Sequence, residues 1–425
     1  MTTVLILVML GFLLAFGMPL FFALAVASAT YFYFAGIDLA LLAQRMTAAV
    51  DSFLILAIPF FYLAGELMNA CKLTDRIVEM SKAFVGHIHG GLGQVNILAS
   101  MLFSGMSGSA TADTTALGSV LIPAMKKEGY PAPFSAAVTV ASAMVGPIIP
   151  PSVALVIYGA LANVSIGRLL LAGIIPGLVI IGTQMVFTYF YARAKNFPRY
   201  ERADIKTMTR ATRRGAAALL FPVIIVGGIL SGIFTPTEAA AVAVAYGLVL
   251  SVFVFRNVSA REIWNVFQSV SLGSVRILVI IAVASAFSWI MVREQVPQVI
   301  AQGLSTVSDD GLVVLFIIIA MLLVVGLFMV ASSAEIVLTP ILVPVVVQFG
   351  IDPVHFGVLM VFTLIIGGGT PPVGVLLFIA QDIAQISFGQ MVRAMIPFYI
   401  PLFAAVVLLA LFPELTLFLP NLVFG

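Results

Sequence analysis

Charged residues are scarce in this chain of 425 residues: Asp, Glu, Lys and Arg make up 9% of it, whereas apolar residues make up 62%. A soluble domain carries about 25% charged residues. Because no soluble core can hide so much apolar surface, most of the chain must have lipid as its solvent. The formal net charge of +2 is too small to indicate nucleic-acid binding. Composition therefore indicates a polytopic membrane protein.

Cysteine and histidine are also scarce. The single cysteine, Cys71, excludes an intramolecular disulfide and a cysteine-based metal cluster. Three histidines, at positions 87, 89 and 355, are poor material for a zinc site or a redox centre. The N-terminus lacks a basic region and a small-residue cleavage site. The apolar stretch Val4–Gly17 is therefore interpreted as a first membrane segment and not as a cleaved signal peptide.

Apolar runs long enough to cross a bilayer recur along the chain. About 20 apolar residues span the hydrocarbon as a helix, which predicts spans at Val4–Gly17, Pro19–Ala35, Ser52–Ala70, Pro131–Ala162, Leu169–Tyr191, Ala216–Ser231, Thr235–Phe255, Val275–Val292, His355–Ala380 and Val392–Leu411. The first two could instead form one long kinked helix, because Gly17 and Pro19 permit either a turn or a kink. Small polar residues interrupt two further apolar regions, Leu92–Met125 and Leu312–Val347, which we interpret as re-entrant hairpins.

The distribution of Lys and Arg predicts the orientation. Eight of the 20 basic residues lie between Arg193 and Arg214, so this loop should be cytoplasmic. With the two interrupted regions as hairpins that return to the side they entered, 17 basic residues are cytoplasmic and three are not: Arg45, Arg168 and Arg293. This topology places both chain ends on the outer side.

The chain resembles itself when it is shifted by 221 positions. Pro150-Pro151 fall on Pro371-Pro372, and further pairs are Pro123 with Pro344, Gly129 with Gly350, Gly146 with Gly367, and Pro176 with Pro397. Paired Gly and Pro at one offset are less easily accidental than matched Leu or Val. We predict two repeats, residues 1–214 and 215–425, each with five crossings and one hairpin. Because five is odd, the second repeat is inverted, which is typical of secondary transporters.

Four interruptions indicate where the chemistry lies. The hairpin tips are expected at Ser104–Asp113 and Ala331–Glu335, and two spans are broken at Gly146–Ser152 and Gly367–Gly374. Irregular backbone at membrane depth must be buried in protein or line a cavity. A half-helix that ends at a break offers carbonyls to a cation, and one that begins there offers N–H groups to an anion. One tip facing one break in each half predicts two cation sites that flank a central anion site. Oxygen ligands favour Na⁺, and proton coupling remains open.

Several charged residues within or beside these segments have two interpretations. Asp113 and Glu335 follow the two tips and serve either as ligands or as carboxylates that satisfy backbone donors at a helix start. Arg276 and Arg393 lie at predicted span ends and are interpreted as snorkelling side chains. Glu66 and Glu238, also near predicted span ends, are given scaffold roles. Two amphipathic stretches, Lys72–His89 and Glu294–Thr306, are either interfacial arms or solvated connecting helices.

Two other classes of protein fit parts of the pattern. Gly105–Gly108 matches the G-x-S-G pattern of intramembrane serine proteases, which need a histidine base within reach. His87 and His89 lie in a cytoplasmic stretch, whereas His355 begins a helix at the outer face. The second tip lacks the pattern, so an enzyme is not expected. A passive anion channel is the better alternative to a carrier.

Four segments together resemble the large membrane subunit of TRAP (tripartite ATP-independent periplasmic) transporters: the first hairpin, Gly146–Ser152, Thr235–Ala240 and Gly367–Pro372. The resemblance covers essentially the whole chain. It implies an all-helical fold similar to the divalent anion/sodium symporters, with an elevator mechanism in the bacterial inner membrane. It also implies Na⁺ coupling, a separate small four-helix membrane subunit, and a periplasmic binding protein that delivers the cargo. The cargo would be a small organic carboxylate; the overall likeness favours sialic acid, with C4-dicarboxylates next.

On this basis we predict the binding residues. The first Na⁺ site is expected at Ser104, Gly105, Ser109, Asp113, Gly146 and Pro150. The second is expected at Ser332, Ser333, Glu335, Gly367, Gly369 and Thr370. The substrate carboxylate is expected to contact Ser107, Ser109, Ser152, Ser333 and Thr370.

Overall fold

The computed structural model describes residues 2–71, 73–256 and 258–425, and all regular structure within these ranges is helical. Lys72, the first residue of one predicted arm, lies outside the described residues. Within the described part of the chain, eight helical segments are long and apolar enough to cross a membrane. These are Phe53–Ala70, Ile166–Ala194, Ile205–Leu230, Pro236–Val254, Ala260–Arg293, Gly311–Phe328, Ala331–Gln348 and Phe388–Leu411. The chain is therefore a polytopic membrane protein.

Helices follow one another with short connections. The first half contains α1 (Thr2–Ala15), α2 (Leu20–Phe34), α3 (Leu39–Val50), η1 (Phe53–Leu56), α4 (Ala57–Ala70), α5 (Thr74–Val85), α6 (Gly91–Ser107), α7 (Ala110–Lys127), α8 (Ala132–Ala143), α9 (Val153–Ala162), α10 (Ile166–Ala172) and α11 (Ile174–Ala194). The second contains α12 (Ile205–Leu230), α13 (Pro236–Val249), the π-helical turn η2 (Leu250–Val254), α14 (Ala260–Arg293), α15 (Val296–Ser305), α16 (Gly311–Phe328), α17 (Ala331–Gln348), α18 (Pro353–Gly368), α19 (Val375–Ala384), α20 (Phe388–Leu411) and α21 (Glu414–Phe424).

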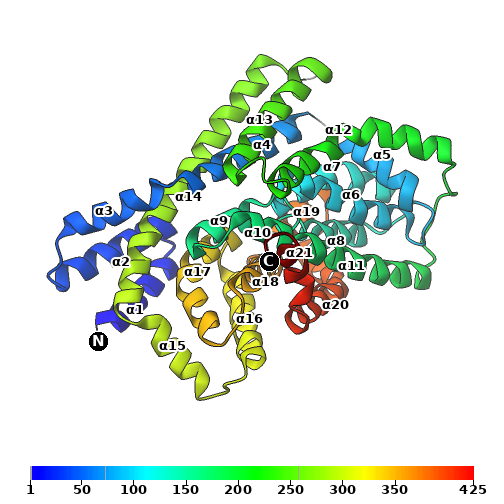
Figure 1. Ribbon diagram of the computed structural model, residues 1–425. Coiled ribbons are helices and arrows are strands. Elements are labelled where there is room, and N and C mark those ends of the chain that lie inside the picture. The colour runs from blue at the N-terminus through cyan, green and yellow to red at the C-terminus, as the bar shows by residue number, and fades with distance from the viewer. Residues whose placement is uncertain (1, 72, 257) are drawn as a thin grey trace.

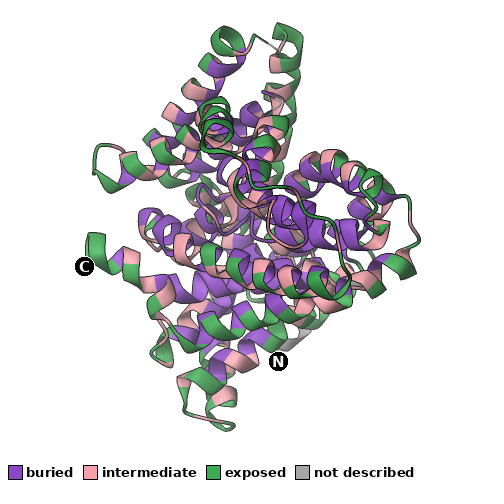
Figure 2. Ribbon diagram, turned by 90° about the vertical axis from the view of Figure 1, so that its right-hand side faces the viewer, coloured by how far each residue is buried: buried purple, intermediate pink, exposed green. Residues whose placement is uncertain are grey.

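The helices pack in two groups. In the first group, α14 contacts α2, α3 and α4, and α13 contacts α4 (Figure 1). The second group contains both hairpins and both broken helices. Here α7 contacts α8 of its own half and α19 of the other half, and α17 contacts α18 of its own half and α9 of the other. The two halves of the chain therefore interlock around the interruptions. Figure 2 shows the buried residues concentrated in the interior, with exposed faces along the outer helices.

The motif that begins at Thr235 has a local structural explanation. The Thr235 side chain accepts a hydrogen bond from the Glu238 backbone N–H, and the Glu238 carboxylate accepts one from the Thr235 backbone N–H at 2.8 Å. This is a capping box, and Pro236 occupies the first helical position, where a missing N–H costs nothing. The motif therefore starts α13, and Glu238 has the scaffold role that the sequence predicts.

The structure differs from the predicted spans at several places. Gly17 adopts a φ of +79° and separates α1 from α2, so the kinked-helix alternative is wrong. Three helices, α3, α10 and α21, lie outside the predicted set or extend it. No side chain of α3 is buried, which explains why it lacks a long apolar run. Helices α12 and α14 begin earlier than Ala216 and Val275 because their first turns are polar and capped by Asp204 and Ser259.

The helix bounds follow the predicted offset at the hairpins. Helix α7 covers Ala110–Lys127 and α17 covers Ala331–Gln348, so both ends differ by 221. The Pro150-Pro151 and Pro371-Pro372 bonds, which show the same offset, are both cis. The division at residue 214 and the inverted orientation of the second half stay predictions.

Candidate functional site

The first hairpin turns at two residues, Gly108 and Ser109, between α6 and α7. Gly108 has a φ of +59°, and a Cβ added there would lie 2.7 Å from the Pro151 carbonyl oxygen. Only glycine suits both the left-handed backbone and this close approach. The first tip thus lies directly on the break between α8 and α9, as the sequence predicts.

Asp113 is fully buried within this tip. Its carboxylate accepts hydrogen bonds from the Ser104 hydroxyl, at 2.7 Å between Oγ and Oδ2, and from the Ser107 hydroxyl. Gly146, in the break, faces the same carboxylate: an added Cβ would lie 2.8 Å from Oδ2. The structure therefore brings together three residues of the predicted first cation site, namely Ser104, Asp113 and Gly146.

The remaining residues of the first site lie at its edge. A Cβ added at Gly105 would lie 3.8 Å from the Pro150 carbonyl oxygen, so these two residues are neighbours. Ser109 caps α7, where its hydroxyl accepts from the Ala112 backbone N–H at 3.5 Å. The Ser152 hydroxyl donates to the Pro147 carbonyl at 2.5 Å and accepts from the Leu155 N–H at 3.0 Å. Ser152 is fully buried, and both of its contacts serve the start of α9.

The second hairpin turns earlier than expected. Its non-helical residues are Met329 and Val330, whereas Ala331–Glu335 already form the first turn of α17. Small residues and an acidic residue suit a helix start, so this polar stretch does not have to unwind. Glu335 is buried, and its Oε1 atom has no hydrogen-bond partner among the described residues.

The second break begins after Gly368 and is built on a close helix contact. Helices α16 and α18 meet at Gly326 and Gly367, where a Cβ added at Gly326 would lie 2.9 Å from the Gly367 Cα. The Thr370 hydroxyl donates to the Ile366 carbonyl at 2.7 Å, and the Gly369 carbonyl accepts from the Tyr399 hydroxyl at 3.0 Å. Thr370 and Gly369 therefore have partners within the helices around them.

Both tips line one central cavity of about 680 Å³. Its polar side chains from the hairpins are Ser107, Ser109, Thr111, Ser332, Ser333 and Glu335. Of the five residues predicted to contact the substrate, Ser107, Ser109 and Ser333 line this cavity. The other two, Ser152 and Thr370, do not line it; their hydroxyls bond the Pro147 and Ile366 carbonyls.

The cavity is also lined by polar residues that the sequence analysis did not assign to the site. Tyr62 and Glu66 come from α4, and Arg276 comes from α14. The snorkelling interpretation of Arg276 rested on a predicted span that begins at Val275, and it stays a prediction. Because α14 begins at Ala260 and ends at Arg293, Arg276 lies near the middle of the helix. The capping sequence at Ser259 was the signal that could have revealed this.

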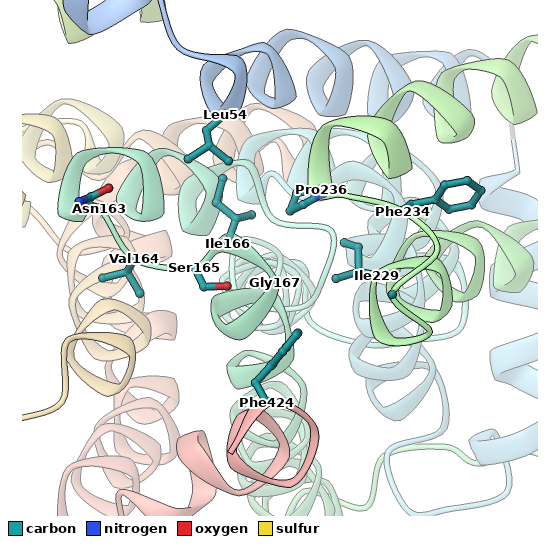
Figure 3. A pocket seen from close by; sticks show the side chains of 11 residues that line it. Leu54, Asn163, Val164, Ser165, Ile166, Gly167, Ile229, Phe234, Pro236 and Phe424 are labelled. Carbon is teal, nitrogen blue, oxygen red and sulfur yellow. The ribbon is translucent and has the colours of Figure 1, made fainter.

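A second, smaller cavity of about 390 Å³ lies between the α9–α10 connection, the α12–α13 connection and Phe424 (Figure 3). Asn163 and Ser165 contribute polar side chains, whereas Leu54, Ile229 and Phe234 are apolar. None of the predicted site residues lines it. The predicted substrate contacts Ser107, Ser109 and Ser333 lie in the central cavity instead.

Solved structures with a similar fold are membrane transporters. The Alcanivorax borkumensis YdaH transporter has a TM-score of 0.64 at 15% sequence identity, covering 88% of this chain and 87% of that one. Neisseria gonorrhoeae MtrF, described as one of a class of antimetabolite efflux pumps, has a TM-score of 0.61 at 14% identity, covering 88% of this chain and 83% of that one. At these identities the likeness establishes the fold alone.

Sequence relatives are considerably more similar. The sialic acid TRAP transporter large permease protein SiaM of Vibrio cholerae is 43% identical over 98% of this chain and 97% of its own length. The C4-dicarboxylate TRAP transporter large permease protein DctM of Rhodobacter capsulatus is 36% identical over 98% of this chain and 99% of its own length. The family model of the tripartite ATP-independent periplasmic transporter DctM component matches residues 7–415. The chain therefore belongs to the DctM family of large permease subunits of TRAP transporters.

Proposed function

We propose that this chain is the large subunit of a Na⁺-coupled importer of a small organic carboxylate, with sialic acid as the first candidate and a C4-dicarboxylate as the second. The observation that carries this proposal is the central cavity of about 680 Å³, where hydroxyls of both hairpin tips meet. Hydroxyls serve anions and cations alike. A cavity that both repeats share suits alternating access around one central site.

The residues around each tip fit a bound Na⁺, which would be a co-transported substrate. At the second tip, the unpartnered Glu335 Oε1 is buried beside a cavity that Ser332 and Ser333 also line. A buried carboxylate oxygen without a partner is costly, and a cation would remove that cost. At the first tip, Asp113 and the oxygens of Ser104 and Ser107 form a compact oxygen cluster. Oxygen ligands are those that Na⁺ prefers.

The choice of substrate rests on the relatives. Besides the Vibrio cholerae protein, the Haemophilus influenzae sialic acid TRAP transporter permease protein SiaT is 38% identical over 96% of this chain, which covers 66% of that protein. Its greater length agrees with a large permease joined to a further segment. By analogy with this family, we expect a small four-helix membrane subunit and a periplasmic binding protein as partners. The bacterial inner membrane, with both chain ends periplasmic, is the proposed location.

An elevator-like motion is the proposed mechanism. The hairpins and broken helices pack mainly on one another, whereas α2, α3, α4, α13 and α14 form a separate group. After Na⁺ and the carboxylate bind, the hairpin group would slide against the other group and carry the cargo inward.

Proton coupling and a passive anion channel are the competing functions. The serine hydroxyl of the protease-like motif, Ser107, bonds Asp113, while His355 bonds Thr416 at 2.7 Å.

Uptake into proteoliposomes tests the proposal. The chain, its small subunit and the binding protein are combined, and labelled N-acetylneuraminate and succinate are compared with an inward Na⁺ gradient, a proton gradient or none. We expect uptake of one of the two carboxylates that requires both the Na⁺ gradient and the binding protein. Uptake driven by the proton gradient alone would show that the coupling ion is H⁺ and not Na⁺. Equilibration without any gradient or binding protein would indicate a channel.

A further inference from the structure

Charged side chains of both signs line the central cavity. On the hairpin side, Glu335 is buried with one unpartnered oxygen. On the α14 side, Arg276 contributes a guanidinium, and Gly273 and Ile277 of the same helix line the cavity beside it. Glu66 of α4 adds a second carboxylate, so Arg276 is the one positively charged side chain among the described residues that line the cavity. Because an arginine remains charged at any physiological pH, it is the lining side chain that would attract an anion.

Arg276 has no partner of its own in the described part of the chain. The one ion pair there joins Arg214 to Glu79, and no hydrogen bond to the Arg276 guanidinium is found. Two other arginines of this group of helices differ: Arg293 and Arg45 both lie against the Trp289 ring, at 5.2 and 5.5 Å from its centroid. Arg276 is exposed and lines the cavity, so its guanidinium is available to a ligand.

Arg276 lies beside a close contact between α14 and α4. Gly273, one helical turn earlier, faces Tyr62 so closely that an added Cβ would lie 2.4 Å from the ring. Tyr62 and Glu66 of α4 line the same cavity as Arg276. No ion pair joins Glu66 to Arg276 in the described residues, so the guanidinium stays available. Its two parallel N–H groups match a carboxylate better than any other side chain does.

We infer that Arg276 binds the substrate carboxylate from the α14 side of the central cavity, which the hydroxyls of the hairpin tips also line. This inference rests on the proposed function and adds a specificity-determining residue to it. A carboxylate held in this way contacts both groups of helices at once. A substrate of the same shape but without the negative charge should bind more weakly, because it leaves the guanidinium without an anionic partner.

Charge-selective labelling tests where the guanidinium points. Val330 lines the cavity and is exposed, whereas the native Cys71 is buried, so V330C supplies a reactive thiol there. Its labelling rates with an anionic and a cationic methanethiosulfonate are compared in detergent-solubilised transporter. We expect R276Q to lower the anionic-to-cationic rate ratio by about threefold or more. An unchanged ratio would mean that Arg276 points into lipid and would overturn the inference.

Substrate protection of the same thiol tests the carboxylate contact. N-acetylneuraminate and its uncharged methyl ester are titrated as protectants of V330C. R276Q should raise the half-protecting concentration of the acid about tenfold or more, R276K should raise it less, and neither should affect the ester. A charge-dependent labelling ratio with equal protection by the acid in all variants would overturn the carboxylate contact. If N-acetylneuraminate fails to protect V330C while Arg276 is intact, the result counts against the proposed cargo. The labelling ratio alone then decides whether Arg276 faces the cavity.

Matched variants keep the test independent of folding. R261Q removes the same charge from α14 at a residue that does not line the cavity, and it should change neither the ratio nor the protection. Each variant is first compared with the parent by gel filtration and by its thermal unfolding midpoint. If R276Q fails to fold, R276K carries the test, because it retains the charge but loses the paired N–H geometry.

Discussion

Gly146 leaves room for the carboxylate of Asp113: a methyl group on Gly146 would lie 2.8 Å from Asp113 Oδ2, and 3.1 Å from the Ala143 carbonyl oxygen. The carboxylate belongs to the first hairpin and the glycine to the broken helix that faces it. A change at one residue therefore tests whether the contact between tip and break matters for ion coupling.

Gly146→Ala should displace the Asp113 carboxylate from Ser104. We expect the unfolding free energy to fall by about 1–3 kcal/mol, as for overpacked cores, and the half-saturating Na⁺ concentration for uptake to rise severalfold. Thermal unfolding in detergent and Na⁺ titration of proteoliposome uptake measure these effects. Gly182→Ala is the control, because an added Cβ meets nothing within 4 Å. Normal Na⁺ dependence in G146A would remove Gly146 from the first cation site.

Glu335→Gln separates the two roles left open for this carboxylate. If Glu335 is a cation ligand, the neutral variant should raise the half-saturating Na⁺ concentration about tenfold or more. Its stability without Na⁺ should be unchanged or higher, because a buried carboxylate with an unpartnered oxygen is removed. Glu238→Gln serves as the comparison, since Glu238 caps α13 and should leave Na⁺ dependence intact. A stability loss with normal coupling in E335Q would make Glu335 a purely structural residue.

The contact between α16 and α18 should tolerate no side chain at its centre. An alanine at Gly326 would bring its Cβ to 3.0 Å from the Leu364 carbonyl oxygen, and one at Gly367 would meet Gly326. We expect either substitution to lower the unfolding midpoint clearly, with a loss of about 1–3 kcal/mol. Gly227→Ala, where the added Cβ meets nothing within 4 Å, should cause no loss. Equal unfolding midpoints in G326A, G367A and G227A would show that α16 and α18 can move apart without a loss of stability.

The start of α12 should weaken in acid. Hydrogen bonds from the Thr207 side chain and backbone N–H hold the pKa of Asp204 below its ordinary value. Because the folded-state pKa is the lower one, this stabilisation is present above the unfolded-state pKa and is lost as the pH falls through the folded-state pKa. Asp204→Asn keeps a capping oxygen but cannot titrate. Between pH 5 and pH 3, the thermal unfolding midpoint should therefore fall further in the parent than in D204N. Equal falls in both proteins would contradict this role of Asp204.

The sequence by itself determined the membrane class, the positions of the interruptions and the family motifs. These features depend on local chemistry: glycine and proline interrupt helices wherever they lie, and long apolar runs require lipid. The tip at Gly108 and the breaks after Ala143 and Gly368 lie within or beside the predicted ranges. Likewise, the predicted neighbours Ser104, Asp113 and Gly146 are close together.

Only the tertiary structure decided which hydroxyls face the cavity and what else lines it. Ser152 and Thr370 bond backbone carbonyls nearby. Which partner a hydroxyl binds depends on its rotamer and on packing, and neither can be read from the residue type. Helix α14 was expected to begin at Val275 because hydropathy ignores polar helical turns, whereas the capped helix extends about 15 residues further toward the N-terminus. The cavity itself joins residues from nine helices of both halves, so no local pattern could have shown it.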